Sequence, residues 1–193
     1  MKEIVLASNN KHKIREIKEI LDNVDILTLN DIGFYDEIEE NGNTFLENAL
    51  IKARTISKFL RTKNINCDVL ADDSGLCCIA INLEPGIYSA RYSGVHDAVK
   101  ANRDKLIKNL IGKDKTAYFN CTIVLYHPDD TYEYSEGKTY GKIIDEEIGD
   151  TSFGYDCIFL SDDLNKTFGE ASEEDKNKVS HRYRALQKIK KYI

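Results

Sequence analysis

The stretch Asp68-Val69-Leu70-Ala71-Asp72-Asp73-Ser74-Gly75 changes abruptly from apolar to acidic and turn-forming residues. Its first half, residues 68–71, predicts a buried strand, and its second half predicts the loop at which that strand ends. Two adjacent carboxylates after a buried strand are costly unless a metal ion, hydrogen bonds or water satisfy them. Because side chains alternate along a strand, Asp72 and Asp73 should point in different directions. One can then face a reaction while the other anchors the loop, and an ordinary acidic turn is the alternative.

Strands and helices alternate around this stretch. Residues 4–7 predict a short strand, and apolar residues at helical spacing from Ile14 to Leu21 predict the helix that follows it. The same patterns predict further helices at residues 44–60, at about 98–110 and near the C-terminus. Further strands are predicted at residues 117–126, 131–138 and 155–160, with a turn at 127–130. This order predicts the α/β class with a mixed sheet.

The composition bounds the kind of protein. A chain of 193 residues with 41% hydrophobic residues is near the size of one domain, so we expect residues 1–193 to form a single domain. No apolar run approaches the roughly 20 residues needed to cross a bilayer, and the start of the chain lacks a secretory cleavage pattern. The five cysteines are odd in number and have neither disulfide nor zinc spacing. We therefore expect a cytoplasmic protein with reduced thiols and no membrane partner.

The formal net charge of -6 argues against a nucleic-acid partner, because a basic surface supplies most of the non-specific affinity for nucleic acid. A polyanionic ligand would therefore need a local cationic pocket. Four basic side chains could form one: Lys11, Lys13, Lys176 and Arg182. The sequence leaves open whether they converge.

The loop before the first predicted helix carries hydroxyl, amide, imidazole and ammonium groups: Ser8, Asn9, Asn10, Lys11, His12 and Lys13. Free backbone N–H groups and the helix dipole at such a place favour a phosphate. The alternative is that Ser8 or Asn10 only caps the helix.

Three other segments carry weaker signals. Residues 38–49 form an acidic loop that enters a helix, where carboxylates could hold Mg²⁺ together with water and substrate phosphates. Acidic residues in a first helical turn also complement the helix dipole, so this pattern is common without a metal. Residues 153–156 and 176–182 supply groups that can stack on a purine and bond its edge, although such residues are also ordinary at strand and helix boundaries.

Six motifs stand along the chain in a fixed order: Ser8-x-Asn10-x-x-Lys13, Glu40 through Ala49, Ala71-Asp72-Asp73-Ser74-Gly75-Leu76, Pro85 through Gly94, Phe153-Gly154-Tyr155-Asp156, and Ser180-His181-Arg182. In this order and spacing they resemble the inosine/xanthosine triphosphate pyrophosphatase family along nearly the whole chain. The chain departs from that family at Asn9 and His12, where many relatives carry glycine, and at Cys157, where proline is usual.

The resemblance implies a fold and a site. The fold would be one domain with an elongated central mixed sheet flanked by helices, in two lobes with the active-site cleft between them, and the protein would be a homodimer. Asp73 would be the general base and would hold Mg²⁺ together with Glu40. The substrate-binding residues would be Ser8, Asn9, Asn10, Lys11, His12, Lys13, Ser74, Phe153, Gly154, Tyr155, Asp156, Lys176, His181 and Arg182. The triphosphate would contact Ser8, Asn10 and Lys13, and the purine base would be recognised by residues 153–156 with His181 and Arg182.

The implied activity is hydrolysis of deaminated purine nucleoside triphosphates, those of inosine, deoxyinosine and xanthosine, to the nucleoside monophosphate and pyrophosphate. Two alternatives stay open: a pyrophosphatase of similar architecture that acts on pyrimidine or modified nucleotides, and a nucleotide-binding module without turnover. The presence of both Glu40 and Asp73 disfavours the module, because a pure binder has less need of a water-activating carboxylate.

We predict that Lys13→Ala weakens nucleotide binding with little loss of fold, because the Lys13 ammonium should face the phosphates rather than the core. Calorimetry with a non-hydrolysable inosine triphosphate analogue and Mg²⁺ measures this affinity. An unchanged affinity would remove Lys13 from the phosphate site.

Overall fold

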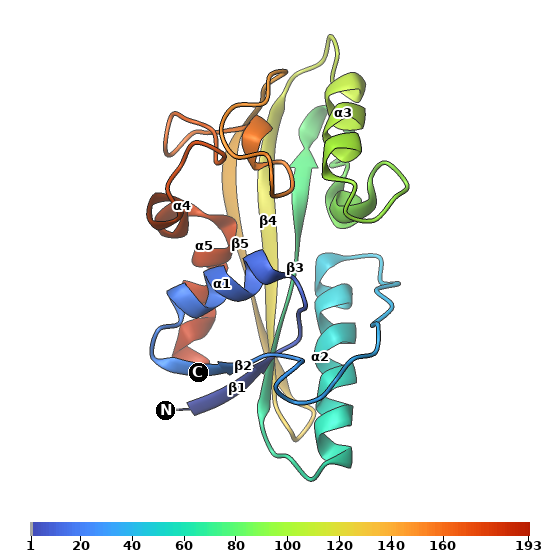
Figure 1. Cartoon of the computed structure of the whole chain (residues 1–193), viewed down its shortest axis with the longest axis vertical. Coiled ribbons are helices and arrows are strands. Elements are labelled where there is room, and N and C mark those ends of the chain that lie inside the picture. Colours follow the sequence, from blue (N-terminus) through green and yellow to red (C-terminus); the bar gives the residue numbers. More distant parts are fainter. Residues whose placement is uncertain (1) are drawn as a thin grey trace. The chain divides into compact units, whose positions relative to one another are not determined.

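Within residues 2–193, the part of the chain that a computed structural model describes, six strands form one sheet in the order β2-β1-β3-β4-β5-β6 (Figure 1). The strands are β1 (Lys2–Leu6), β2 (Val24–Leu27), β3 (Asp68–Cys78), β4 (Thr116–Tyr126), β5 (Tyr132–Ile143) and β6 (Phe159–Ser161). β1 pairs in parallel with both β2 and β3, whereas β5 and β6 are antiparallel. This mixed sheet, flanked by helices, confirms the predicted α/β class.

Helices connect most of the strands. The α-helices are α1 (Lys11–Ile20), α2 (Phe45–Thr62), α3 (Val99–Asn109), α4 (Glu173–Val179) and α5 (His181–Ile189). Short 3-10 helices lie at η1 (Ile79–Ile81), η2 (Gly86–Arg91), η3 (Asp156–Ile158) and η4 (Lys190–Tyr192). In the described range, no helix combines the length and the apolar character needed to cross a membrane.

Backbone contacts divide the chain into two compact units. The first unit comprises Met1–Asp73, Cys121–Gly137 and Arg182–Ile193, and the second comprises Ser74–Asn120 and Lys138–His181. Strands β3, β4 and β5 contribute residues to both units. The expectation that residues 1–193 form a single domain stays a prediction.

The first unit buries both faces of β1. Ile4 and Leu6 pack in one apolar cluster with residues of α1 and α5, whereas Val5 packs in another cluster with residues of α2 (Figure 1). All three side chains are fully buried, and a fully buried side chain of this size contributes about 1.5–3 kcal/mol. A strand covered on both faces has a continuous apolar sequence, which is why residues 4–7 could be recognised as a strand.

The second unit has a core of its own that is rich in aromatic rings. Phe119 meets Phe159 edge to face, with ring centroids 4.7 Å apart, and lies parallel to Phe168 at 6.0 Å. Leu106 and Leu110 from α3 and its C-terminal cap join the same cluster. Helix α3 is therefore fixed to the unit through the aromatic core.

Three predicted strand boundaries were wrong. β3 does not end at residue 71 but continues through both aspartates to Cys78, because ion pairs and hydrogen bonds satisfy their carboxylates within the sheet. β5 extends five residues beyond 138, and two of its three buried positions there, Thr139 and Gly141, are small or polar, so hydrophobic alternation does not mark them. Residues 155–160 were predicted as a strand, yet η3 occupies their centre and only Phe159 and Leu160 belong to β6.

The turn between β4 and β5 carries a histidine held between two carboxylates. His127 Nδ1 lies 2.8 Å from Asp68 Oδ1, and its Nε2 lies 2.6 Å from Glu133 Oε2. Lys2 Nζ is 2.8 Å from the other oxygen of Asp68. Burial by itself lowers the pKa of His127, but the hydrogen bonds to Asp68 and Glu133 outweigh it and raise that pKa above 6.5. The His127 ring therefore ties the hairpin to β3 through Asp68, and the two carboxylates favour its charged form.

We predict that His127→Gln lowers the free energy of unfolding in a pH-dependent way. A histidine with a raised pKa in the folded state stabilises the fold fully below its unfolded value of 6.5. That stabilisation is lost as the pH rises through the folded pKa. Urea unfolding of both proteins on either side of this range should show a gap that closes at high pH. His96→Gln is the control, because His96 and its partner Asp97 are both exposed. A gap that is constant with pH would contradict the charged clamp.

Candidate functional site

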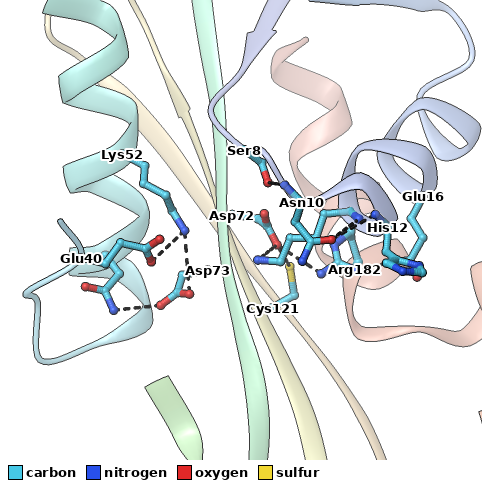
Figure 2. A network of polar contacts seen from close by, with 12 residues as sticks. Ser8, Asn10, His12, Glu16, Glu40, Lys52, Asp72, Asp73, Cys121 and Arg182 are labelled. Carbon is cyan, nitrogen blue, oxygen red and sulfur yellow. Dashed lines mark hydrogen bonds and ion pairs between the residues drawn. The ribbon is translucent and has the colours of Figure 1, made fainter. Parts of the chain in front are cut away.

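Asp72 and Asp73 point to opposite sides of β3, as the alternation of a strand predicts (Figure 2). The carboxylate of Asp72 meets Lys13 Nζ at 3.1 Å and an Arg182 nitrogen at 3.3 Å. Asp73 turns to the α2 side, where Asn48 Nδ2 donates to its Oδ2 at 3.0 Å. The two neighbouring carboxylates therefore have separate sets of partners.

Asp72 is a buried anchor. It is 1% exposed, and burial alone would raise its pKa, but the charges of Lys13, Arg182 and Lys52 outweigh burial and hold the pKa well below its usual range. Arg182 is equally buried and also pairs with Glu16 of α1. This chain of alternating charges keeps Asp72 ionised and links α1, β3 and α5.

Asn10 caps the first turn of α1. Asn10 Oδ1 accepts hydrogen bonds from the backbone N–H groups of His12 at 3.0 Å and Lys13 at 3.2 Å. Ser8 Oγ accepts from Asn10 N at 3.2 Å. The cap does not exclude an anion, because the helix N-terminus and the Lys13 ammonium still supply positive potential there. Asn9 and Lys11 are exposed beside this turn.

Three side chains converge on the other side of β3 (Figure 2). Lys52 Nζ lies 3.0 Å from Glu40 Oε2 and 3.9 Å from Asp73 Oδ1. Burial by itself lowers the pKa of Lys52, but the charges of Asp73 and Glu40 outweigh it and raise that pKa. One cation is therefore shared by two carboxylates.

Asn48 and Lys52 were not identified from the sequence. They lie four residues apart on α2, so they share one face of that helix, and both are buried. Asn48 Oδ1 accepts from Gly42 N at 2.9 Å while its Nδ2 donates to Asp73, so the amide fixes the acidic loop against the strand. An amide and an ammonium group at helical spacing beside an apolar face was the signal that could have found them.

The acidic loop contains two glutamates with different tasks. Glu47 belongs to the helix cap, since its carboxylate accepts from Asn43 N at 2.6 Å and its own N–H donates to Thr44 Oγ1 at 3.1 Å. Glu40 instead faces Lys52. Only Glu40 of this pair is directed toward Asp73.

Glu40 and Asp73 have the donor chemistry of a magnesium site. Oxygen ligands from one or two carboxylates, completed by water and phosphate, are typical for Mg²⁺. In the described residues no group of three or more His, Cys, Asp or Glu could hold a metal ion. Burial raises the pKa of Asp73, and the charges of Lys52 and Lys13 only partly offset this effect. A buried carboxylate with a raised pKa is stabilised in its ionised form by a further cation. Glu40 and Asp73 therefore fit the predicted Mg²⁺.

The remaining predicted residues lie in the second unit. Lys176 Nζ contacts Asp156 Oδ2 at 2.6 Å and stands 5.0 Å from the centre of the Phe153 ring. His181 stacks on Phe119, with centroids 4.9 Å apart. Tyr155 donates its hydroxyl to the backbone oxygen of Ser89 at 2.7 Å, so that side chain supports the local backbone. Ser74 follows Asp73 on β3, and Gly154 adopts a positive φ of 51°.

Arg182 belongs to the first unit, where its guanidinium is engaged by Glu16 and Asp72. Its role in reading the base stays a prediction. Lys13 likewise has a structural task as a counter-ion of Asp72. The expectation that this side chain does not serve the fold was therefore wrong, and we expect Lys13→Ala to reduce stability as well as affinity.

The fold and this site define a class of protein. It is an α/β protein in which carboxylates, cations and a helix N-terminus meet at one strand, as binding of a phosphorylated ligand requires. A family model described as the Ham1 family matches residues 4–192. This chain therefore belongs to the Ham1 family.

Individual relatives agree with that assignment. A dITP/XTP pyrophosphatase of Clostridium perfringens is 45% identical over 196 residues, which cover 98% of this chain and 96% of that protein. A dITP/XTP pyrophosphatase of Bacillus subtilis is 41% identical over 198 residues, covering 100% and 98%. Among solved structures, the Ham1 protein of Staphylococcus aureus is 40% identical with a TM-score of 0.86, covering 99% of this chain and 97% of that one. These findings confirm the family that the motifs predicted.

We predict that Asp72→Asn lowers the free energy of unfolding by about 3–5 kcal/mol, the cost of leaving buried charges without their partner. Asp73→Asn should cost far less without divalent metal, because burial already raises the pKa of Asp73 and disfavours its charge. Urea unfolding of the two variants in a chelator measures the difference. Equal losses would show that Asp72 is not the anchor of the site.

Proposed function

We propose that this protein hydrolyses deaminated purine nucleoside triphosphates, those of inosine, deoxyinosine and xanthosine, to the nucleoside monophosphate and pyrophosphate. Its class is that of a nucleoside-triphosphate pyrophosphatase, a hydrolase, the activity that names its relatives from Clostridium perfringens and Bacillus subtilis. The observation that carries the proposal is that Glu40 and Asp73 of β3 share one cation, the Lys52 ammonium of α2. The reaction would remove damaged nucleotides from the pool.

Charge at β3 supports chemistry on a triphosphate. Lys13 acts on Asp73 as well as on Asp72, and Lys52 acts on Asp72 as well as on Asp73, since each ammonium lowers the pKa of both carboxylates. The cations of α1 and α2 therefore contribute to one electrostatic site. Such preorganised charge stabilises a reaction that develops negative charge on phosphate oxygens.

Mg²⁺ would be held by Glu40 and Asp73, and when bound it supplies charge neutralisation for the phosphates. The remaining steps belong to side chains of this protein. Lys13 and Lys52 would bind and orient the phosphates. Asp73, held in place by the Asn48 amide, would accept a proton from the attacking water. The water oxygen forms a bond to the α-phosphorus, and the bond from that phosphorus to the bridging oxygen breaks, so pyrophosphate leaves.

Base selection is assigned to the motif residues of the second unit. A 6-keto purine presents an acceptor at the position where adenine presents a donor. A protein donor aimed at this position would pair with the 6-keto purine, whereas adenine would leave it buried and unpaired, so the site would discriminate strongly against adenine. The Phe153 ring and the Lys176–Asp156 pair supply a stacking face and polar groups for this purpose. His181, stacked on Phe119, adds an imidazole.

Two further properties are proposed with the activity. The five cysteines are all free thiols, which supports a reducing compartment such as the cytoplasm. Homodimerisation is proposed from the family resemblance alone.

We predict the products and the preference of the reaction. With Mg²⁺, the purified protein should convert inosine, deoxyinosine and xanthosine triphosphates to monophosphate and pyrophosphate much faster than adenosine, guanosine and cytidine triphosphates. Asp73→Asn should bind nucleotide yet lose most turnover, because it keeps the shape of the side chain and removes its charge. Product chromatography and nucleotide calorimetry measure the two effects.

The outcomes separate the alternatives. Orthophosphate and diphosphate products would refute the assigned bond. Faster turnover of a pyrimidine nucleotide would favour the pyrimidine-directed pyrophosphatase, and binding without turnover would favour the non-catalytic module. Lys108→Ala, an exposed change on α3, is the control for handling of the variants.

A further inference from the structure

Two consecutive buried polar side chains on α3 each hold a separate loop of the second unit. Asn102 is 2% exposed, donates to Ala90 O at 3.1 Å and accepts from Ser93 N at 2.7 Å. Arg103 is also 2% exposed and bonds the loop of residues 147–154. Neighbouring residues of a helix point about 100° apart, so one turn of α3 can serve two loops.

Arg103 makes three hydrogen bonds through two nitrogens of its guanidinium. Nε donates to Glu147 Oε1 at 2.9 Å, and one terminal nitrogen donates to Thr151 O at 3.2 Å and to Gly154 O at 2.8 Å. A guanidinium offers five donors in a rigid plane, whereas an ammonium offers a single centre. A buried cation that bonds two backbone oxygens therefore fixes the path of the loop, because loss of either bond leaves polar groups unsatisfied.

The held loop runs directly into the proposed base-recognition segment. Gly154, whose carbonyl accepts from Arg103, lies between Phe153 and Tyr155 and has a φ of 51°, in the left-handed region. Tyr155 then donates to Ser89 O at 2.7 Å. Two contacts thus fix the backbone between Phe153 and Tyr155: the bond from Arg103 to the Gly154 carbonyl and the bond from the Tyr155 hydroxyl to Ser89 O.

Asn102 completes the arrangement. The acceptor of the Tyr155 hydroxyl, Ser89, lies in η2, and Asn102 bonds the backbone of η2 at Ala90 and that of the following turn at Ser93. Helix α3 therefore holds both segments that the Tyr155 hydrogen bond joins, residues 89–93 and residues 151–154. Leu106 anchors that helix in the core.

We propose that Arg103 is a positioning residue for base selection: it sets the backbone of residues 151–154 and so places Phe153 against the purine. The proposal rests on the proposed function of this segment. Arg103 itself acts through the loop. The expected consequence is a loss of discrimination between bases with little change in phosphate chemistry.

The test compares Arg103→Lys with Glu147→Gln and Lys108→Ala. Arg103→Lys keeps the positive charge but loses the planar donors, so the kcat/KM ratio of inosine to adenosine triphosphate should fall about tenfold, the scale of one buried hydrogen bond. Most of that fall should appear as a higher KM for inosine triphosphate. Glu147→Gln keeps an acceptor for Arg103 Nε and leaves both carbonyl bonds in place, so its ratio should stay within about twofold of the wild type. Lys108→Ala should match the wild type.

Hydrogen exchange of the ligand-free proteins gives a readout that is independent of activity. In Arg103→Lys, amides of residues 151–156 should exchange faster while amides of β1 and α2 do not. Faster exchange throughout the chain, unchanged exchange at 151–156, or an equal loss of base selection in Glu147→Gln would overturn the proposal. Failure of the proposed function is distinguishable, because the wild-type protein itself would then show no preference for inosine triphosphate.

Discussion

The first unit depends on a buried carboxylate, Asp72, inside the central strand β3. An ionised group at 1% exposure is tolerated only where opposite charges reach it. Lys13 and Arg182 supply those charges from α1 and α5, which lie far apart in sequence, and Glu16 balances Arg182 in turn. Removing Asp72 would take away the directional charge pairs that tie α1 and α5 to β3, and such pairs fix position more sharply than apolar packing does.

Because side chains alternate along β3, two neighbouring residues have different tasks: Asp72 stabilises the fold, and Asp73 is proposed to take part in the reaction. Asp72 is compensated by two direct cations and stays ionised, whereas Asp73 on the other face keeps a pKa raised by burial despite Lys52. The second carboxylate is therefore the one whose charge is least satisfied by the protein itself. That imbalance supports the proposed role of Asp73 as a ligand of Mg²⁺ and a base for water.

The second unit also depends on a buried charged side chain, but here it is a cation, Arg103. Arg103 is satisfied by one carboxylate and two backbone oxygens, and those oxygens belong to an irregular loop. Backbone carbonyls are present at every residue, so their use as partners leaves no mark in the sequence. An arginine in an amphipathic helix reads as a solvent-facing residue until its surroundings are known.

The sequence by itself determined the α/β class, the main helices and most strands, because apolar periodicity and capping residues such as Thr44 act locally. It also determined the family, and that resemblance pointed to Glu40 and Asp73; the paired carboxylates after a buried strand drew attention to Asp72 and Asp73 by themselves. Only the tertiary structure decided that β3 continues through its aspartates, that Asp72 anchors while Asp73 faces α2, and that Lys52 joins them. The physical reason is that the cost of a buried charge depends on partners that chain folding brings from distant segments, and no local pattern records those partners.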